Sequence, residues 1–81
     1  MVHATILVST EVPARQESPK KLKKLISQLK EHPEVKNAFV VYGRVDIVVF
    51  IDANNYQRIS EISHTINQTP TVTYTETLVE G

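Results

Sequence analysis

One carboxylate stands beside a predicted turn, in a position where a charge needs a partner. Asp46 follows Gly43 and Arg44 and comes directly before a long apolar run. Charged side chains are rare in such places unless they are paired. The N–H groups of the turn could satisfy the Asp46 carboxylate, as they often do for aspartates near turns. Asp46 therefore either stabilises the turn or serves a site outside it.

The other titratable side chains do not form a catalytic or metal centre. His3, His32 and His64 are expected at a strand start, a helix end and a helix face, without the spacing of metal ligands. Tyr42 and Asp52 are closer in sequence to the carboxylate at the turn, but no nucleophile or phosphate-binding loop accompanies them. The sequence has no cysteine, which excludes thiolate chemistry. We therefore expect no catalysis, no metal and no cofactor.

Length and charge place the chain among small cytoplasmic proteins. Its 81 residues suffice for one domain, spanning residues 1–81, with a modest core that association with further copies would stabilise. Nine Lys and Arg residues balance nine Asp and Glu residues, so the chain carries no charge footprint for nucleic acid or an anionic membrane. No stretch approaches the roughly 20 apolar residues of a membrane span, and the first residues do not resemble a signal peptide.

Two β-branched and aromatic runs that meet at Gly43 predict a β-hairpin. Its first arm begins near Lys36 and its second ends at Asp52, with Gly43 supplying the backbone freedom for a tight connection. Alternation places apolar side chains on both faces of the second arm: Val45, Ile47, Val49 and Ile51 on one, and Val48 and Phe50 on the other. Both faces of the predicted sheet are therefore apolar.

Amphipathic helices are predicted before and after this hairpin. The first has Ser18 as N-cap and Pro19 at its first position, and it ends at Pro33. The second begins at Asn54, which forms a capping-box-like pair with Gln57. Their buried stripes are Leu22, Leu25, Ile26 and Leu29 in the first helix, and Ile59, Ile62, Ser63 and Ile66 in the second.

Strands at residues 4–9 and 72–79 complete the chain. In the last strand, Val72, Tyr74, Glu76 and Leu78 alternate with Thr71, Thr73, Thr75 and Thr77. The order strand, helix, strand, strand, helix, strand predicts the ferredoxin-like α+β fold βαββαβ, a four-stranded antiparallel sheet with two helices on one face. The other face stays bare and apolar, so we expect a symmetric dimer formed through the open sheet face.

Three stretches of the sequence resemble the Lrp/AsnC family of transcription regulators. They are Pro33-Glu34-Val35, Tyr42-Gly43-Arg44-Val45-Asp46-Ile47 and Pro70-Thr71-Val72-Thr73-Tyr74-Thr75-Glu76-Thr77. The resemblance is to the effector-binding half of these regulators, the RAM domain (regulation of amino acid metabolism), and runs from Ala4 to Glu80. The chain departs from the family in a longer first loop, in Thr71 where Gly is common, and in Val45 where an aromatic residue is common.

The resemblance implies dimers that assemble into rings, often octamers, and an amino acid effector bound between dimers near the turn. Matched by position, the ligand-binding candidates are Gly43, Arg44, Asp46, Thr75 and Thr77. Asp46 would hold the ammonium group of the effector, while N–H groups near Gly43 and the threonine hydroxyls would receive its carboxylate. Because no helix-turn-helix half precedes the first strand, we expect a stand-alone module acting in transcriptional regulation of amino acid metabolism. Its expected partners are further copies of itself and full-length regulators of the family, not nucleic acid or a membrane.

Other interpretations are compatible with the same residues. The threonine row suits a half-exposed strand by β-propensity alone. Lys20, Lys21, Lys23 and Lys24 fit the solvated side of a helix and lack the interleaved aromatic residues of a nucleic-acid site. The chain could also be a ligand-free adaptor that co-assembles with full-length regulators, or a small dimeric α+β-barrel enzyme such as a monooxygenase.

Overall fold

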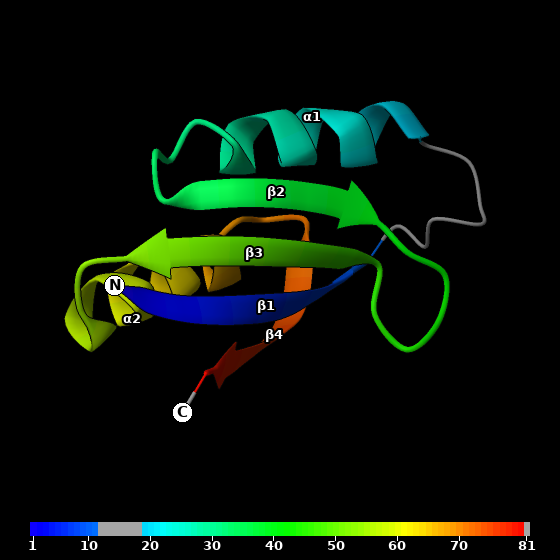
Figure 1. Cartoon of the computed structure of the whole chain (residues 1–81). Coiled ribbons are helices and arrows are strands. Elements are labelled where there is room, and N and C mark those ends of the chain that lie inside the picture. The colour runs from blue at the N-terminus through cyan, green and yellow to red at the C-terminus, as the bar shows by residue number, and fades with distance from the viewer. Residues whose placement is uncertain (12–18, 81) are drawn as a thin grey trace.

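Six elements follow one another in the predicted order in the computed structural model (Figure 1). They are β1 (Val2–Thr10), α1 (Pro19–Leu29), β2 (Val35–Val40), β3 (Ile47–Ala53), α2 (Tyr56–Asn67) and β4 (Val72–Val79). The structure describes residues 1–11 and 19–80, so the predicted cap at Ser18 lies outside the described residues. All strand pairs are antiparallel, in the order β2-β3-β1-β4, which confirms the βαββαβ fold. No helix within the described ranges is long and apolar enough to cross a membrane.

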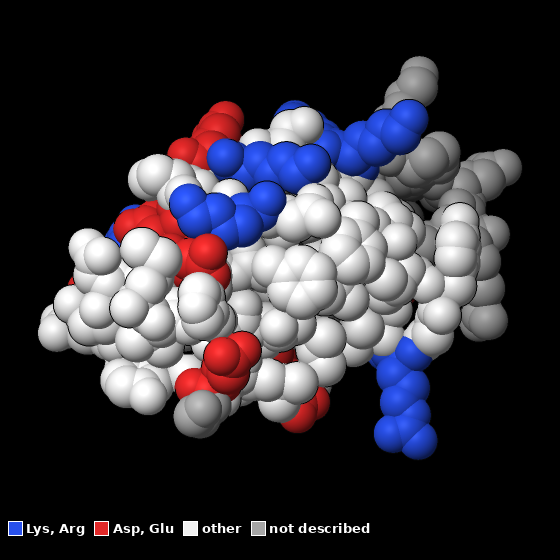
Figure 2. Space-filling model, in the orientation of Figure 1, with Lys and Arg blue, Asp and Glu red and all other residues white. Residues whose placement is uncertain are grey.

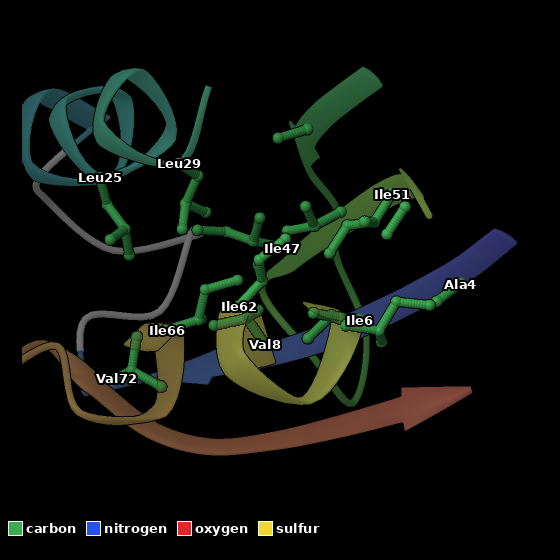
Figure 3. Packing of buried hydrophobic residues seen from close by; sticks show 14 of the residues in the cluster. Ala4, Ile6, Val8, Leu25, Leu29, Ile47, Ile51, Ile62, Ile66 and Val72 are labelled. Atoms are coloured by element: carbon green, nitrogen blue, oxygen red, sulfur yellow. The ribbon is translucent and has the colours of Figure 1, made fainter. Parts of the chain in front are cut away.

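Both helices pack on one face of the sheet and enclose the core. The strands contribute side chains from every second position: Ala4, Ile6 and Val8 of β1, and Ile47, Val49, Ile51 and Ala53 of β3. The helices contribute Leu22, Leu25 and Leu29 of α1, and Ile59, Ile62 and Ile66 of α2. Figure 3 shows Leu25, Leu29, Ile62 and Ile66 directed from the two helices toward the strands. The predicted apolar stripes therefore form the core, with Ile26 partly buried at its margin.

Helix α2 begins at a different cap from the predicted one. The Asn55 side chain accepts a hydrogen bond from the Arg58 backbone N–H at 2.8 Å. Asn55 is therefore the N-cap, and the prediction of Asn54 with Gln57 was wrong by one residue. Two adjacent asparagines offer the same capping chemistry, so the local pattern does not select between them.

The connection between β2 and β3 is wider than predicted. It spans residues 41–46, and its base is closed by a bond from the Val41 N–H to the Asp46 carbonyl at 2.9 Å. The Gly43 backbone does not adopt the left-handed conformation, and a Cβ added there would meet no atom within 4 Å. The predicted tight turn at Gly43 was therefore wrong, and Val45 precedes β3 instead of continuing its alternation.

Strand β4 changes its phase near its start. Thr10 pairs with Val72 while the preceding Ser9 pairs with Tyr74, so Thr73 is the extra residue of a β-bulge. Val72 consequently lies in the core, whereas Tyr74 lies on the opposite face. The predicted alternation that grouped Val72 with Tyr74 was wrong, because a single inserted residue reverses the face of everything before it.

The second face of the sheet is apolar and uncovered within one chain. Four large side chains on it remain open to solvent: Phe39 (37% exposed), Phe50 (41%), Tyr74 (57%) and Leu78 (49%). The rings of Phe39 and Phe50 are in contact, with centroids 5.7 Å apart. Figure 2, which views the sheet from the side away from α2, shows an uncharged middle with charged side chains toward its margins. We call this surface the open face.

Candidate functional site

Asp46 joins the β2–β3 connection to the end of β1. Its backbone N–H donates to the Val8 carbonyl at 2.8 Å. Its Oδ2 atom accepts hydrogen bonds from the Thr10 backbone N–H at 2.8 Å and the Thr10 hydroxyl at 3.3 Å. The carboxylate therefore has a structural role, although its donors come from a neighbouring strand and not from the turn.

Gly43 and Arg44 lie in the same connection and are exposed. Within the described residues, Arg44 forms no ion pair and the Gly43 backbone forms no hydrogen bond. They lie with Asp46 in the segment between β2 and β3, residues 41–46, which we call the connecting loop. The loop thus presents an exposed guanidinium and open backbone on a stem held by Asp46.

Thr75 and Thr77 lie on β4, on the side that faces the helices. The Thr77 hydroxyl and the Ser63 hydroxyl of α2 form a hydrogen bond of 2.6 Å. Thr75 pairs with Val8 in the strand register and is half-buried. Thr77 therefore belongs to the contact between α2 and β4, and Thr75 lies on the same side of the sheet.

The five predicted site residues do not converge within one chain. Ile47, Val8 and Thr75 lie in one row across β3, β1 and β4. Asp46 precedes Ile47 and so lies on one side of that row, while Thr77 lies on the other side. Neighbouring strands lie about 4.8 Å apart and each residue adds about 3.4 Å along a strand, so the Cα atoms of Asp46 and Thr77 are roughly 14 Å apart. In Figure 1 the connecting loop projects from one end of the sheet, while α2 lies behind the other half.

A groove of about 410 Å³ runs between α2 and β4, which we call the α2–β4 groove. It is lined by Tyr56, Ile59, Ser60, Ser63, His64, Asn67, Thr77 and Val79. Ile59 is buried, while Ser60, His64 and Asn67 are exposed along its rim. Its size is in the range of small-molecule sites, and its lining combines apolar floor with hydroxyl, imidazole and amide groups. Thr77 is the one predicted site residue that lines it.

Sequence reasoning missed the α2 side of this groove. Ser60, His64 and Asn67 are spaced i, i+4 and i+7, which places them on one flank of the helix. That spacing is visible in the sequence, beside the apolar stripe that was recognised. The other missed residue is Thr10, whose bond to Asp46 spans 36 positions and leaves no local signal.

The opposite flank of α2 carries the charges. Arg58 donates to both oxygens of Glu34, from Nε at 2.7 Å and from Nη2 at 3.2 Å. A further bond from Arg58 to Glu61 measures 3.4 Å. The hydrogen bond from Arg58 lowers the pKa of the Glu34 carboxyl below its ordinary value, and the same pairing raises the pKa of Arg58. This network ties the start of β2 to α2 on the side away from the groove.

The three histidines lie in different parts of the fold. His3 contacts the Asp52 carboxylate through Nδ1 at the first residues of β1, His32 follows α1, and His64 lines the α2–β4 groove. In residues 1–11 and 19–80, no group of three His, Cys, Asp or Glu side chains is placed to hold a metal ion.

Comparison with known proteins gives a consistent result. Residues 6–80 match the family described as Lrp/AsnC ligand binding domain. The structure of FFRP-DM1 is 31% identical with a TM-score of 0.78, and the match covers 99% of both chains. The hypothetical protein PHS023 from Pyrococcus horikoshii is 30% identical with a TM-score of 0.79, over 99% of this chain and 89% of that one.

A longer protein shares the same fold. The leucine response regulatory protein LrpA of Mycobacterium tuberculosis is 16% identical with a TM-score of 0.73. The match covers 98% of this chain and 49% of LrpA, so the chain spans about half the length of that regulator. A search of curated protein sequences found no match.

Proposed function

The chain belongs to the Lrp/AsnC ligand-binding domain family, and from this premise we propose that it senses an amino acid and acts in transcriptional regulation. The family description supports the binding of a small molecule, and the fold shared with half of LrpA supports a regulatory role. The observation that carries the proposal is the α2–β4 groove, a small-molecule-sized hollow lined by the predicted ligand residue Thr77.

We place the effector where the α2–β4 groove of one copy meets the connecting loop of another. The Cα atoms of Asp46 and Thr77 lie roughly 14 Å apart in one chain, as worked from standard strand spacings. The Asp46 carboxylate bonds to Thr10, on the side away from Thr77, while the Thr77 hydroxyl bonds to Ser63 of α2, so the two groups are directed apart. The exposed loop with Gly43 and Arg44 has no partner surface of its own among the described residues. A site shared by two copies brings the two halves together.

In this arrangement the loop binds the part common to all amino acids. The Asp46 carboxylate accepts from the ammonium group while Thr10 holds it in place. The backbone N–H groups near Gly43 and the Arg44 guanidinium receive the carboxylate of the effector. The α2–β4 groove is then left for the side chain of the effector.

Assembly begins, on this proposal, with a symmetric dimer formed through the open face. The exposed Phe39, Phe50, Tyr74 and Leu78 form an apolar surface that a second sheet would cover. Because this surface is on the other side of the sheet from the helices, pairing leaves the α2–β4 groove and the connecting loop accessible. Dimers can then associate further through the loop and groove into a ring.

The test is native mass spectrometry of the protein alone and with each of the twenty amino acids. We expect an assembly of dimers that retains one amino acid per shared site. Asp46→Asn keeps an acceptor oxygen for Thr10 but removes the charge, and Thr77→Val removes the groove hydroxyl while keeping its shape. Each variant alone should bind the effector at least tenfold more weakly, since a charge-assisted or buried hydrogen bond is lost.

Mixing the two variants distinguishes a shared site from a site within one chain. After unfolding and refolding together, an Asp46→Asn chain supplies an intact groove and a Thr77→Val chain supplies an intact loop. Where these meet, a complete site forms, so mixed assemblies should regain part of the parental binding. A mixture as inactive as its components would contradict the two-copy site. An assembly that binds none of the amino acids would instead support the ligand-free adaptor.

A further inference from the structure

We propose that the effector carries an uncharged side chain, because neither wall of the α2–β4 groove presents a Lys, Arg, Asp or Glu side chain. This inference rests on the proposed function and specifies the ligand class for the same site. The groove lining contains no Lys, Arg, Asp or Glu. In a chain where 22% of the residues are charged, this absence follows from the geometry of two elements.

The first wall is one flank of α2. Residues of an α-helix are spaced by about 100°, so Tyr56, Ser60, Ser63 and Asn67 lie within about 60° of one another. Arg58 and Glu61 lie on a different flank, where Arg58 donates to Glu34 and to Glu61. The only charged residues of α2 are thus held away from the groove.

The second wall is the helix side of β4. Thr77 and Val79 line the groove, and Thr75 precedes them on the same side of the strand. Glu76 is opposite Leu7 in the strand register, on the open face, and Glu80 continues that alternation. The bulge at Thr73 sets this phase, so the carboxylates of β4 point away from α2.

A charged side chain would enter this groove at a cost. It would lose water without gaining an opposite charge, and desolvation of an unpaired charge is among the least favourable contributions to binding. An uncharged side chain meets hydroxyl, amide and imidazole groups. Ser60, His64 and Asn67 form no side-chain hydrogen bond within the described residues and can donate or accept.

The charges of the connecting loop do not change this preference. Asp46 and Arg44 from the second copy face the ammonium and carboxylate groups that every amino acid carries. Their contribution is therefore common to all candidate effectors. Discrimination between side chains is left to the groove.

Amino acids that differ only in charge provide the test. Calorimetric titrations of the assembled protein use the twenty standard amino acids and citrulline, which has the shape of arginine without its charge. We expect the tightest ligand to be uncharged. Glutamine over glutamate and citrulline over arginine should each be favoured by roughly tenfold or more, as expected when a site leaves a buried charge unpaired.

A variant that adds one charge to the groove checks the cause. Asn67→Asp changes an amide into a carboxylate of nearly the same shape and should shift the citrulline-to-arginine preference toward arginine by roughly threefold to fivefold, as for a partly exposed ion pair. Gln57→Glu makes the same change on α2 outside the groove and should leave the preference unchanged.

The outcomes separate the two proposals. If arginine, lysine, aspartate or glutamate binds most tightly at a site that Thr77→Val weakens, the proposed function stands and the uncharged-side-chain inference is wrong. An Asn67→Asp variant with the parental preference would also overturn it. If no amino acid binds, the proposed function fails and this inference falls with it.

Discussion

Replacing Phe50 with alanine should dissociate the proposed dimer while leaving the fold nearly intact. Phe50 is 41% exposed on the open face, and its ring contacts that of Phe39. A Phe side chain offers about 150–250 Å² of surface, so roughly 60–100 Å² remains for a second copy to cover. At about 25 cal/mol per Å², that area contributes roughly 1.5–2.5 kcal/mol per copy. Each of the two copies in a symmetric dimer loses this contribution, which gives about 3–5 kcal/mol in total. The dimer Kd should therefore rise roughly a hundredfold to a few thousandfold.

The neighbouring residue supplies a matched control. Val49 is fully buried on the helix side of the same strand. Val49→Ala should lower the free energy of unfolding by about 1–3 kcal/mol through a cavity in the core, without moving the dimer Kd measured where the chain is folded. Sedimentation equilibrium over a dilution series gives the dimer Kd, and urea unfolding gives the stability. A Phe50→Ala protein with the parental dimer Kd would refute pairing through the open face.

Three further changes test the fold and the network on α2. Leu25→Ala removes a buried helix side chain and should cost about 2–5 kcal/mol in urea unfolding, whereas Ser27→Ala on the exposed side of α1 should not lower stability measurably. Because Arg58 lowers the pKa of Glu34, their pairing stabilises the fold above the ordinary value of 4.5, and this contribution is lost as the pH falls below it. Arg58→Gln should therefore reduce the loss of unfolding free energy at acid pH. An unchanged pH dependence of that free energy would show that the Arg58–Glu34 pairing does not contribute to stability. Gly43→Ala should stabilise the fold by about 0.4–1 kcal/mol, because a Cβ meets nothing, the backbone is not left-handed and alanine has fewer conformations in the unfolded chain. A melting temperature lowered by several degrees would contradict this.

The fold could be predicted because its signals are periodic and repeated. Leu22, Leu25 and Leu29 repeat a helical spacing over about two turns, and residues 47–51 of β3 are a continuous run of β-branched and aromatic residues. A pattern repeated over several positions still predicts the right element when one position is misread. The errors occurred where one residue decides the outcome, as at Asn54 against Asn55 and at the bulge that turns Val72 into the core.

The candidate site was harder to predict because it depends on contacts between distant segments. Thr10 and Asp46 are separated by 36 positions, and neither pattern around them signals the other. Thr77 was identified through the family resemblance. Its partner Ser63 and the groove around it are defined by the packing of α2 on β4, which the sequence does not show. If the site is divided between two copies, as we propose, each half is incomplete in a single chain.

The hydrogen bonds at the stem of the connecting loop determine how much freedom binding must remove. Asp46 is fixed to Val41, Val8 and Thr10, so the part of the connecting loop without backbone hydrogen bonds to the described residues is residues 42–45. Fixing four residues costs roughly 4–8 kcal/mol of conformational entropy, at about 1–2 kcal/mol each. Contact with another copy or with the effector would order the loop. The event that occurs first bears this entropy cost and so lowers the cost of the second event. On the proposed function, assembly and effector binding are therefore thermodynamically linked, and each should strengthen the other by the same factor.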